Sequence, residues 1–209
     1  MNSKPPISAV RQFLRDSTHG EHVRLNQHPL LAGITRPDYS LSRYQLVLVA
    51  YYHFYKIIEG AISEFLATRT LSFSYHRRLK LQWIEEDLMR FGIDPEAPAL
   101  LPRSPIEPLE LCDVGQFVGV LYTIEGSSLG GQVISRHLEA HLGLTATTGA
   151  RFFHGYGPDI ASCWRQTEEF IDATLTSDEI RDSATSAAKT TFSLMESLLD
   201  DYHLAHQPV

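Results

Sequence analysis

The segment over residues 41–67 constrains the fold most, because its apolar side chains recur at helical spacing on more than one face. Ser40 or Ser42 can cap its start. The apolar positions are Leu46, Val47, Val49, Ala50, Phe54, Ile57, Ile58, Ile62 and Phe65. A surface helix needs only one apolar stripe, so this wider distribution predicts a helix packed centrally in a bundle.

Helical spacing recurs along most of the remaining chain. We expect further helices over residues 8–26, 75–91, 113–142, 159–175 and 178–203, the last one opened by a capping box of Thr176 and Glu179. Five prolines between Asp94 and Pro108 predict a loop, and no segment alternates with period 2 between turn signals. The chain of 209 residues is long enough for one core and short for two. We therefore expect a single all-α domain over residues 1–209.

Composition narrows the function. A net charge of -7 argues against nucleic acid as the main partner, because phosphate binding depends on clustered Lys and Arg. We interpret the short basic run 77–80 as a solvated helix face, with a docking surface for an acidic protein as the alternative. Two cysteines without metal-site spacing, no apolar stretch that spans a bilayer and no export signal in Met1–Ile7 predict a soluble, cytoplasmic protein without a membrane partner.

His22 is the first candidate for chemistry. It lies four residues after Thr18 and three before Leu25, which places it on the apolar stripe of the first helix and predicts an inward-facing side chain. Such a histidine is more often a hydrogen-bonded core residue than a ligand. Arg15 changes the balance, because it lies two turns earlier on the same face. Haem suits such a pair, with a metal for the imidazole and carboxylates at one edge.

A second candidate interrupts the helix predicted over residues 113–142. The run Glu125-Gly-Ser-Ser-Leu-Gly-Gly-Gln132 contains three glycines, each costing about 1 kcal/mol relative to alanine in a helix interior. Gly126 and Gly130 share one side, where a flat ligand can lie against a kinked backbone. Close packing of another helix explains the glycines equally well. Tyr122, one turn earlier, either fills core or directs its hydroxyl into the same cavity.

Both candidates resemble one family. The segment from Leu14 to His22 is similar to the L-[KR]-x-[AS]-T-x-x-x-H motif of the haem oxygenases, whose last histidine ligates the iron. The segment Tyr122–Val133, with its G-G-Q-V run, resembles the distal helix of that family, and residues 152–164 resemble its C-terminal part. The two motifs stand in the family's order, about 100 residues apart, and the likeness covers essentially the whole chain. The form of the glycine run looks most like the bacterial subgroup that supplies biliverdin to phytochromes.

The resemblance implies an enzyme whose haem is both cofactor and substrate. It would be held between a proximal first helix and a kinked, glycine-rich distal helix, and cleaved with O2 and external electrons into biliverdin, carbon monoxide and iron. His22 would ligate the iron, while Arg15, Tyr122 and Arg165 would bind the cofactor's periphery. The catalytic distal surface would consist of Gly126, Ser127, Gly130 and Gly131.

Two departures from the family pattern affect this reading. Ser127 stands where an aspartate is usual, so a neutral hydroxyl must organise the distal waters, and Asn26 replaces a frequent acidic residue. A haem carrier or sensor of the same fold without turnover is therefore the alternative function. The expected partners of an oxygenase are haem, O2, a reductase or ferredoxin-type electron donor and a bacteriophytochrome that accepts the biliverdin.

Overall fold

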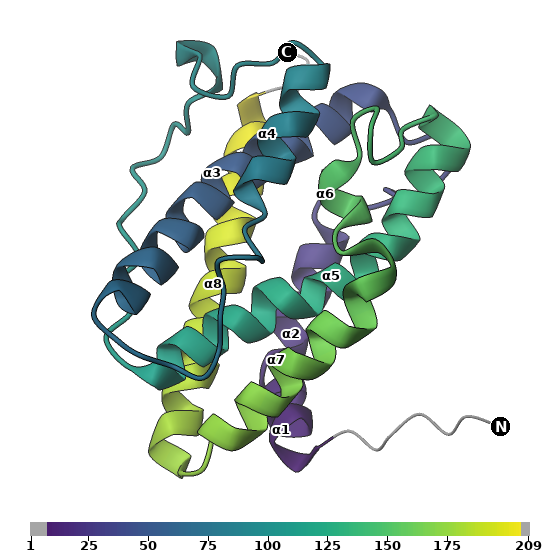
Figure 1. Cartoon of the computed structure of the whole chain (residues 1–209). Helices are drawn as coiled ribbons and strands as arrows, with labels where there is room; N and C mark the ends of the chain where they lie inside the picture. The colour runs from purple at the N-terminus through teal and green to yellow at the C-terminus, as the bar shows by residue number, and fades with distance from the viewer. Residues whose placement is uncertain (1–7, 206–209) are drawn as a thin grey trace, which may run out of the picture.

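The computed structural model describes residues 8–205, so the segment Met1–Ile7, on which the expectation about export rests, lies outside the described residues. Helix α3 (Leu41–Ala67) has the predicted bounds and contributes more than half of its side chains to the interior. It packs against α8 (Asp178–Ala205), which crosses both α3 and α5 (Val114–Leu142) in Figure 1. The buried apolar side chains of these helices form one core cluster. The all-α expectation is confirmed over residues 8–205, where no strand is present.

The predicted first helix is two helices. The helix is interrupted at Thr18, between α1 (Ala9–Ser17) and α2 (His19–Gln27). The Thr18 hydroxyl donates to the carbonyl O of Leu14 at 2.7 Å, a local bond that competes with the regular helical ladder. A single helix to Asn26 was therefore wrong. The break also separates α2, which contains no buried residue, from the apolar stripe of α1.

The predicted helix over residues 75–91 is shorter than expected. Only α4 (Leu81–Arg90) is helical, whereas residues 75–80 form a turn and an irregular segment. Arg78 and Lys80 in that segment are buried, so the reading of residues 77–80 as a solvated helix face was wrong. Periodicity failed here because both cations are turned inward by acidic partners that lie far away in the sequence.

Two 3-10 turns, one short helix and one longer helix complete the described chain. They are the 3-10 turns η1 (Pro98–Leu100) and η2 (Gly157–Asp159), together with α6 (Arg151–His154) and α7 (Ile160–Thr174). The start of α8 differs in detail from the prediction. Ser177, not Thr176, faces the helix, and its hydroxyl accepts a hydrogen bond from Ile180 N at 3.4 Å.

Helix α5 is continuous and approaches α8 very closely. A Cβ at Gly115 would lie 2.7 Å from the carbonyl O of Ile180, and a Cβ at Gly119 would overlap the carbonyl O of Ala184. Only glycine allows the two backbones this separation. Farther along, the axis of α5 changes direction in Figure 1, as its glycine run predicts.

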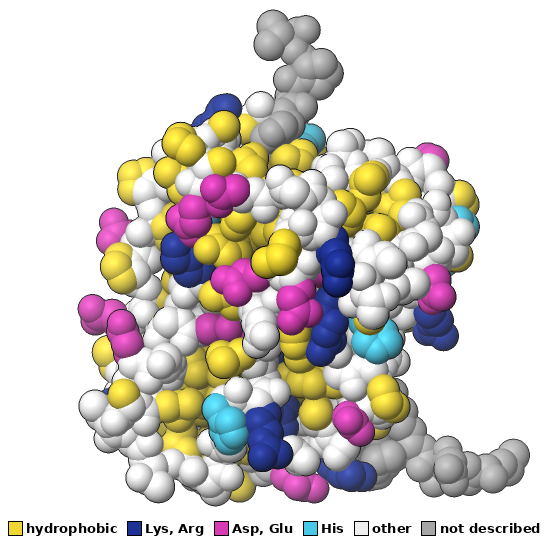
Figure 2. Space-filling view, turned by 45° about the horizontal axis from the view of Figure 1, so that its top comes forward, with side chains coloured by type: hydrophobic (Ala, Val, Ile, Leu, Met, Phe, Trp, Pro, Cys, Tyr) yellow, Lys and Arg dark blue, Asp and Glu magenta, His cyan; other side chains and the backbone are white. Residues whose placement is uncertain are grey.

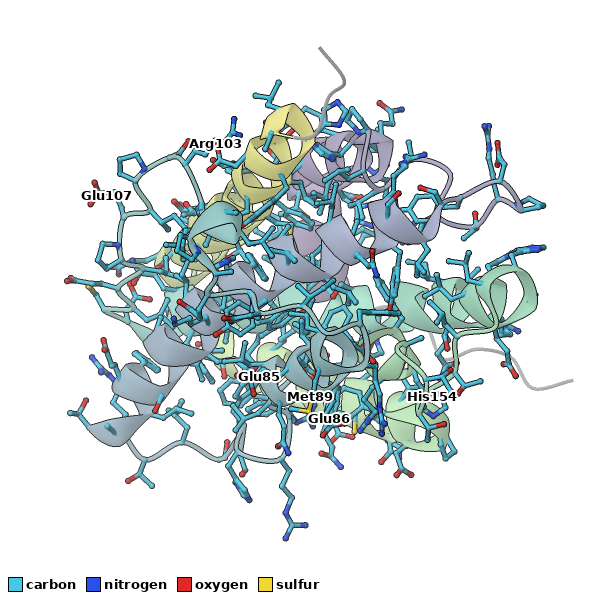
Figure 3. The ribbon with its side chains drawn as sticks, turned by 90° about the horizontal axis from the view of Figure 1, so that it is seen from above. Glu85, Glu86, Met89, Arg103, Glu107 and His154 are labelled. Carbon is cyan, nitrogen blue, oxygen red and sulfur yellow. The ribbon has the colours of Figure 1, made fainter. Side chains whose placement is uncertain are left out.

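The surface is mixed in character. On the face in Figure 2, basic side chains are interspersed with acidic and apolar ones. A cavity of about 800 Å³ lies between α4 and the segment around α6, lined by residues that include Glu86, Met89 and His154, which Figure 3 labels along one side of the molecule. None of the predicted site residues lines this cavity. Among residues 8–205, no helix is long and apolar enough to cross a membrane.

Candidate functional site

His22 lies on α2 with an exposed side chain, so the expectation that it faces inward was wrong. Its ring meets the edge of Phe192 on α8, with centroids 6.2 Å apart, and the Asn26 amide nitrogen lies 3.2 Å from Nδ1. Partial burial lowers the pKa of His22, and the charges of His19 and Arg15 lower it further. The imidazole is therefore held in its neutral form near pH 7, the form that binds a metal ion.

Arg15 and Tyr122 lie near each other where α1 ends. The Tyr122 hydroxyl is hydrogen-bonded to Thr18, and burial raises the pKa of Tyr122 while the positive charges of Arg15 and Arg11 oppose that rise. Arg15 is exposed, whereas Arg11 contacts Glu168 of α7 in an ion pair. The Tyr122–Thr18 hydrogen bond therefore connects α5 to the junction of α1 and α2, next to the charge of Arg15.

Arg165 does not join this group in the structure. It is exposed on α7, and the side chain of α7 that reaches the glycine run is the neighbouring Trp164. Its ring lies 3.6 Å from where a Cβ of Gly126 would be. The prediction for Arg165 as a cofactor-binding residue stays a prediction.

The glycines of the run have different surroundings. A Cβ at Gly131 would lie 3.1 Å from the carbonyl O of Phe153, which is close packing against α6. A Cβ at Gly130 would have no neighbour within 4 Å, and the residue is exposed. The residues of the run therefore differ: Gly131 allows close packing, as one reading predicts, while Gly130 presents exposed backbone with open space beside it.

Ser127 connects the run to the interior. Its hydroxyl donates to the carbonyl O of Ile124 at 2.9 Å and is hydrogen-bonded to Tyr55 of α3. Tyr55 is buried, and this burial raises its pKa well above the usual value, so the phenol stays protonated. Sequence reasoning missed Tyr55 because an aromatic residue on an apolar helix is indistinguishable from core.

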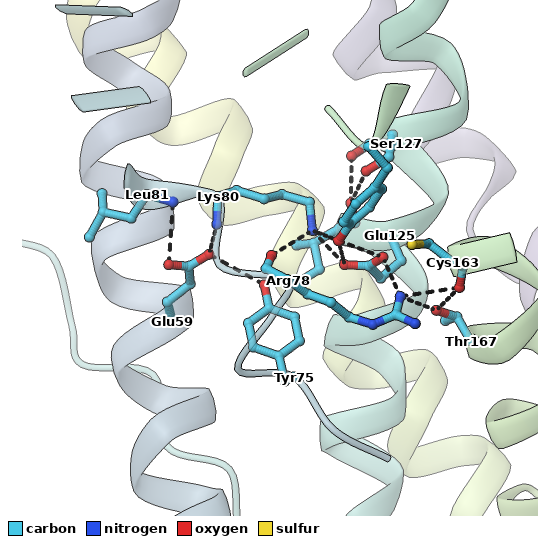
Figure 4. A network of polar contacts seen from close by, with 12 residues as sticks. Glu59, Tyr75, Arg78, Lys80, Leu81, Glu125, Ser127, Cys163 and Thr167 are labelled. Carbon is cyan, nitrogen blue, oxygen red and sulfur yellow. Dashed lines mark hydrogen bonds and ion pairs between the residues drawn. The ribbon is translucent and has the colours of Figure 1, made fainter. Parts of the chain in front are cut away.

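A buried charge cluster stands directly before the glycines. Glu125 is 2% exposed, and its carboxylate meets Arg78 Nη1 at 3.0 Å, Lys80 Nζ and the Tyr156 hydroxyl at 3.0 Å (Figure 4). One signal was available in the sequence. Glu125 lies four residues after buried Leu121, on a face where an unpaired carboxylate would be very costly.

Fold and site together define an all-α protein. It presents a neutral histidine on α2 and exposed backbone on the glycine-rich helix α5, which contacts the start of α2 through Tyr122 and Thr18. Residues 8–201 match the family model described as haem oxygenase. The chain belongs to the haem oxygenase family, which is a family of enzymes. No curated protein matches the sequence significantly.

Solved structures share this fold. The NO- and CO-bound haem oxygenase from Neisseria meningitidis is similar with a TM-score of 0.75 and 19% identity, over 95% of this chain and 94% of that one. The haem oxygenase from Leptospira interrogans has a TM-score of 0.71 and 17% identity, over 92% and 98%. A domain of unknown function with a haem oxygenase-like fold from Shewanella denitrificans has a TM-score of 0.65 and 15% identity, over 95% and 94%.

Proposed function

We propose that this haem oxygenase binds haem between α2 and α5, with His22 as the iron ligand. It cleaves the haem to biliverdin, carbon monoxide and iron, using O2 and electrons from an external donor. The observation that carries the proposal is the pairing of an exposed neutral imidazole at His22 with bare, exposed backbone at Gly130. The Thr18–Tyr122 hydrogen bond brings the helices that carry them together at one end.

The residues present fit haem. Gly130 leaves space that any side chain would fill, as a flat macrocycle requires. The pKa of His22 is lowered, which keeps a ring nitrogen unprotonated for iron. Arg15 and Tyr122 stand where a cation and a phenol can meet the propionate carboxylates. We propose His22, Arg15 and Tyr122 as the residues that hold the ligand, with Arg165 as a further propionate partner from α7.

Haem, when bound, supplies the redox chemistry and the carbon that is oxidised. The chain holds and orients it. Gly130 lets backbone approach one face closely, Gly126 lies beside the Trp164 ring one turn earlier, and Gly131 fixes that backbone against α6. Ser127 of the glycine run and the protonated phenol of Tyr55 on α3 form a hydrogen-bonded pair, from which a proton can be delivered through ordered water. This pair takes the place of the usual carboxylate.

We also propose a location, an electron donor and an acceptor for the biliverdin. Cys112 and Cys163 are unpaired in the structure, which supports a reducing, cytoplasmic location. A reductase or ferredoxin-type protein would deliver the electrons. The Glu125–Gly131 form of the run supports assignment to the subgroup whose biliverdin passes to a bacteriophytochrome.

Titration of the purified protein with haemin tests the site. Wild-type protein should shift the Soret band, and His22→Ala should abolish or greatly change that spectrum, whereas His19→Ala on the same helix should retain it. An unchanged spectrum in His22→Ala would contradict the assignment of the ligand.

Turnover separates the oxygenase from a carrier or sensor. With ascorbate or a reductase under air, the loaded protein should form biliverdin absorption and release carbon monoxide. Haem that stays bound and intact under these conditions would favour the carrier or sensor, for which the lack of a carboxylate at Ser127 is the motive.

A further inference from the structure

The carboxylate of Glu125 is almost completely enclosed by hydrogen-bond donors. Its cationic partners Arg78 and Lys80 are 5% and 2% exposed, and the Tyr156 hydroxyl lies 3.0 and 3.1 Å from the two carboxylate oxygens. Lys80 Nζ also donates to that hydroxyl at 3.1 Å. Removing charges from water is costly, and well-packed apolar residues often stabilise a fold as much. Stability alone therefore does not explain the cluster. A role that does explain it is to hold Glu125 and its partners in one geometry.

The segment that contains Tyr156 contacts α5 a second time, at a residue two turns beyond Glu125. Gln132 Nε2 donates to the carbonyl O of Gly157 at 2.8 Å, and Gly157 follows Tyr156 directly. Both ends of the glycine run are thus fastened to two consecutive residues of one segment. We call this arrangement the brace: Lys80, Tyr156 and Gly157, contacting Glu125 and Gln132.

The brace lies on one side of α5 and leaves another side bare. Residues seven apart share a helix face, so Glu125 and Gln132 point the same way. At about 100° per residue, Gly130 lies roughly 140° around the helix from Glu125. That direction is where a Cβ would meet nothing within 4 Å. The contacts of the brace therefore support the run without covering the surface proposed for haem.

The segment that supplies Lys80 is itself anchored to the central helix. The Glu59 carboxylate of α3 accepts hydrogen bonds from Lys80 N at 2.5 Å and Leu81 N at 3.3 Å. The Tyr75 hydroxyl donates to the same carboxylate at 3.4 Å. Figure 4 shows Glu59 on one side of the segment and Glu125 on the other. The glycine run is thus connected through Lys80 to α3, the helix that also carries Tyr55.

We propose that Lys80 and Tyr156 are positioning residues for haem cleavage, which act through Glu125 by holding the weakly helical glycine run at a set distance from the ligand and from Tyr55. This inference rests on the proposed function. The three glycines give up roughly 3 kcal/mol of helix preference, and the brace restrains a segment that would otherwise fray or shift. The orientation of the run decides which edge of the macrocycle meets it, so the brace is a determinant of the biliverdin isomer.

Tyr156→Phe tests the brace with little change of volume, because it removes only the hydroxyl shared by Lys80 and Glu125. Tyr202→Phe is the matched control, since it deletes another buried tyrosine hydroxyl, which donates to Leu100 O at 2.7 Å near η1. Amide hydrogen exchange of the haem-free proteins should be at least fivefold faster at residues 126–132 in Tyr156→Phe than in wild type. The control should exchange there at the wild-type rate.

Product analysis supplies the second measurement. Tyr156→Phe should bind haemin through His22 with a wild-type Soret band, yet yield a broader mixture of biliverdin isomers or less biliverdin per electron consumed. Unchanged exchange together with an unchanged isomer pattern would overturn the brace. Failure of the wild type to bind haemin would instead contradict the proposed function, and the exchange experiment reads the brace without haem.

Discussion

The two halves of α5 use glycine in opposite ways. In residues 114–125, Gly115 and Gly119 face α8 so closely that a side chain would meet backbone. In residues 126–142, Gly130 faces nothing within 4 Å, although it carries the same helical cost. The first half loses helix preference and gains backbone packing within the protein. In the second half, Gly131 packs against Phe153, whereas Gly130 leaves exposed backbone that nothing in the protein covers, which is the surface proposed for haem.

Glycines in one helix can therefore have different roles, either allowing close backbone packing or leaving backbone exposed. Open space at a helical glycine does not by itself identify a binding surface, because Gly60 on α3 has no neighbour within 4 Å either. Gly130 differs because it lies in a run of three glycines on one helix. Gly131, one residue from Gly130, is packed against Phe153 and shows that the distinction changes within a single residue. Substitutions that add a side chain to each half should therefore have opposite effects on stability.

The largest effect is expected in the first half. Gly119→Ala would place a Cβ against the carbonyl O of Ala184, so α5 and α8 must move apart. Overpacking of this kind costs about 3 kcal/mol, and we expect thermal unfolding roughly 10 °C below wild type. Gly60→Ala, on α3 with open space around it, should be neutral or stabilising. A wild-type melting temperature for Gly119→Ala would contradict the packing described for the first half.

A pH-dependent effect should come from the support of the second half. Asp87 accepts hydrogen bonds from Arg151 N at 2.7 Å and Phe152 N at 2.9 Å, which holds the start of α6. Burial raises the pKa of Asp87 to about 6. A carboxyl whose pKa is raised on folding contributes stability at low pH that is lost as the pH rises through the folded pKa.

The measurement for Asp87 is therefore a difference. The free energy of unfolding of wild type relative to Asp87→Asn should fall by on the order of 2 kcal/mol between pH 4 and pH 7. Exposed Glu85→Gln is the control and should give a much flatter difference. A flat difference for Asp87→Asn would contradict the raised pKa of the buried Asp87 carboxyl.

Gly130→Leu separates ligand binding from stability in the second half of α5. The haem-free variant should melt at or slightly above the wild-type temperature, because leucine favours the helix and its Cβ has no neighbour within 4 Å. Haemin affinity should fall at least tenfold, equivalent to about 1.4 kcal/mol, since the side chain occupies the proposed ligand surface. Titration and melting of the same preparation check both halves of the statement. Unchanged affinity would place the ligand elsewhere.

The smallest structural effect is expected at Ser127. Ser127→Ala removes the hydroxyl bonded to Tyr55 and should slow biliverdin formation severalfold while leaving haemin affinity and melting unchanged. Ser128→Ala is a close control, because Ser128 also donates to Ile124 O, at 3.4 Å. Equal turnover in the two variants would remove Ser127 from the mechanism.

Local pattern predicted the long helices well. The bounds of α3, and the start of α5 at Asp113, whose side chain accepts from Gln116 N, follow from apolar spacing and capping alone. The break at Thr18 could not be predicted from the pattern, because threonine is compatible with a helix. Its side-chain hydrogen bond to Leu14 O is visible only in the structure. His22, four residues after that break, is exposed.

The interior polar groups were the harder part. Arg78 lies 47 residues from Glu125 along the chain, and no local period reports a pair at that separation. The basic run looked ordinary alone, and the one available signal, Glu125 on an apolar face, did not identify its partners. The predicted residues Gly126, Ser127 and Gly130 do lie together on α5, whereas what supports them came only from the structure.

The break at Thr18 has a consequence for how order is distributed between protein and ligand. Helix α2 is only nine residues long and buries no side chain, and isolated helices of that length are marginal in water. Its main packing partner is α8. Part of the free energy of binding at His22 should therefore go into stiffening α2, so that association with the ligand is also the last step of folding for this segment.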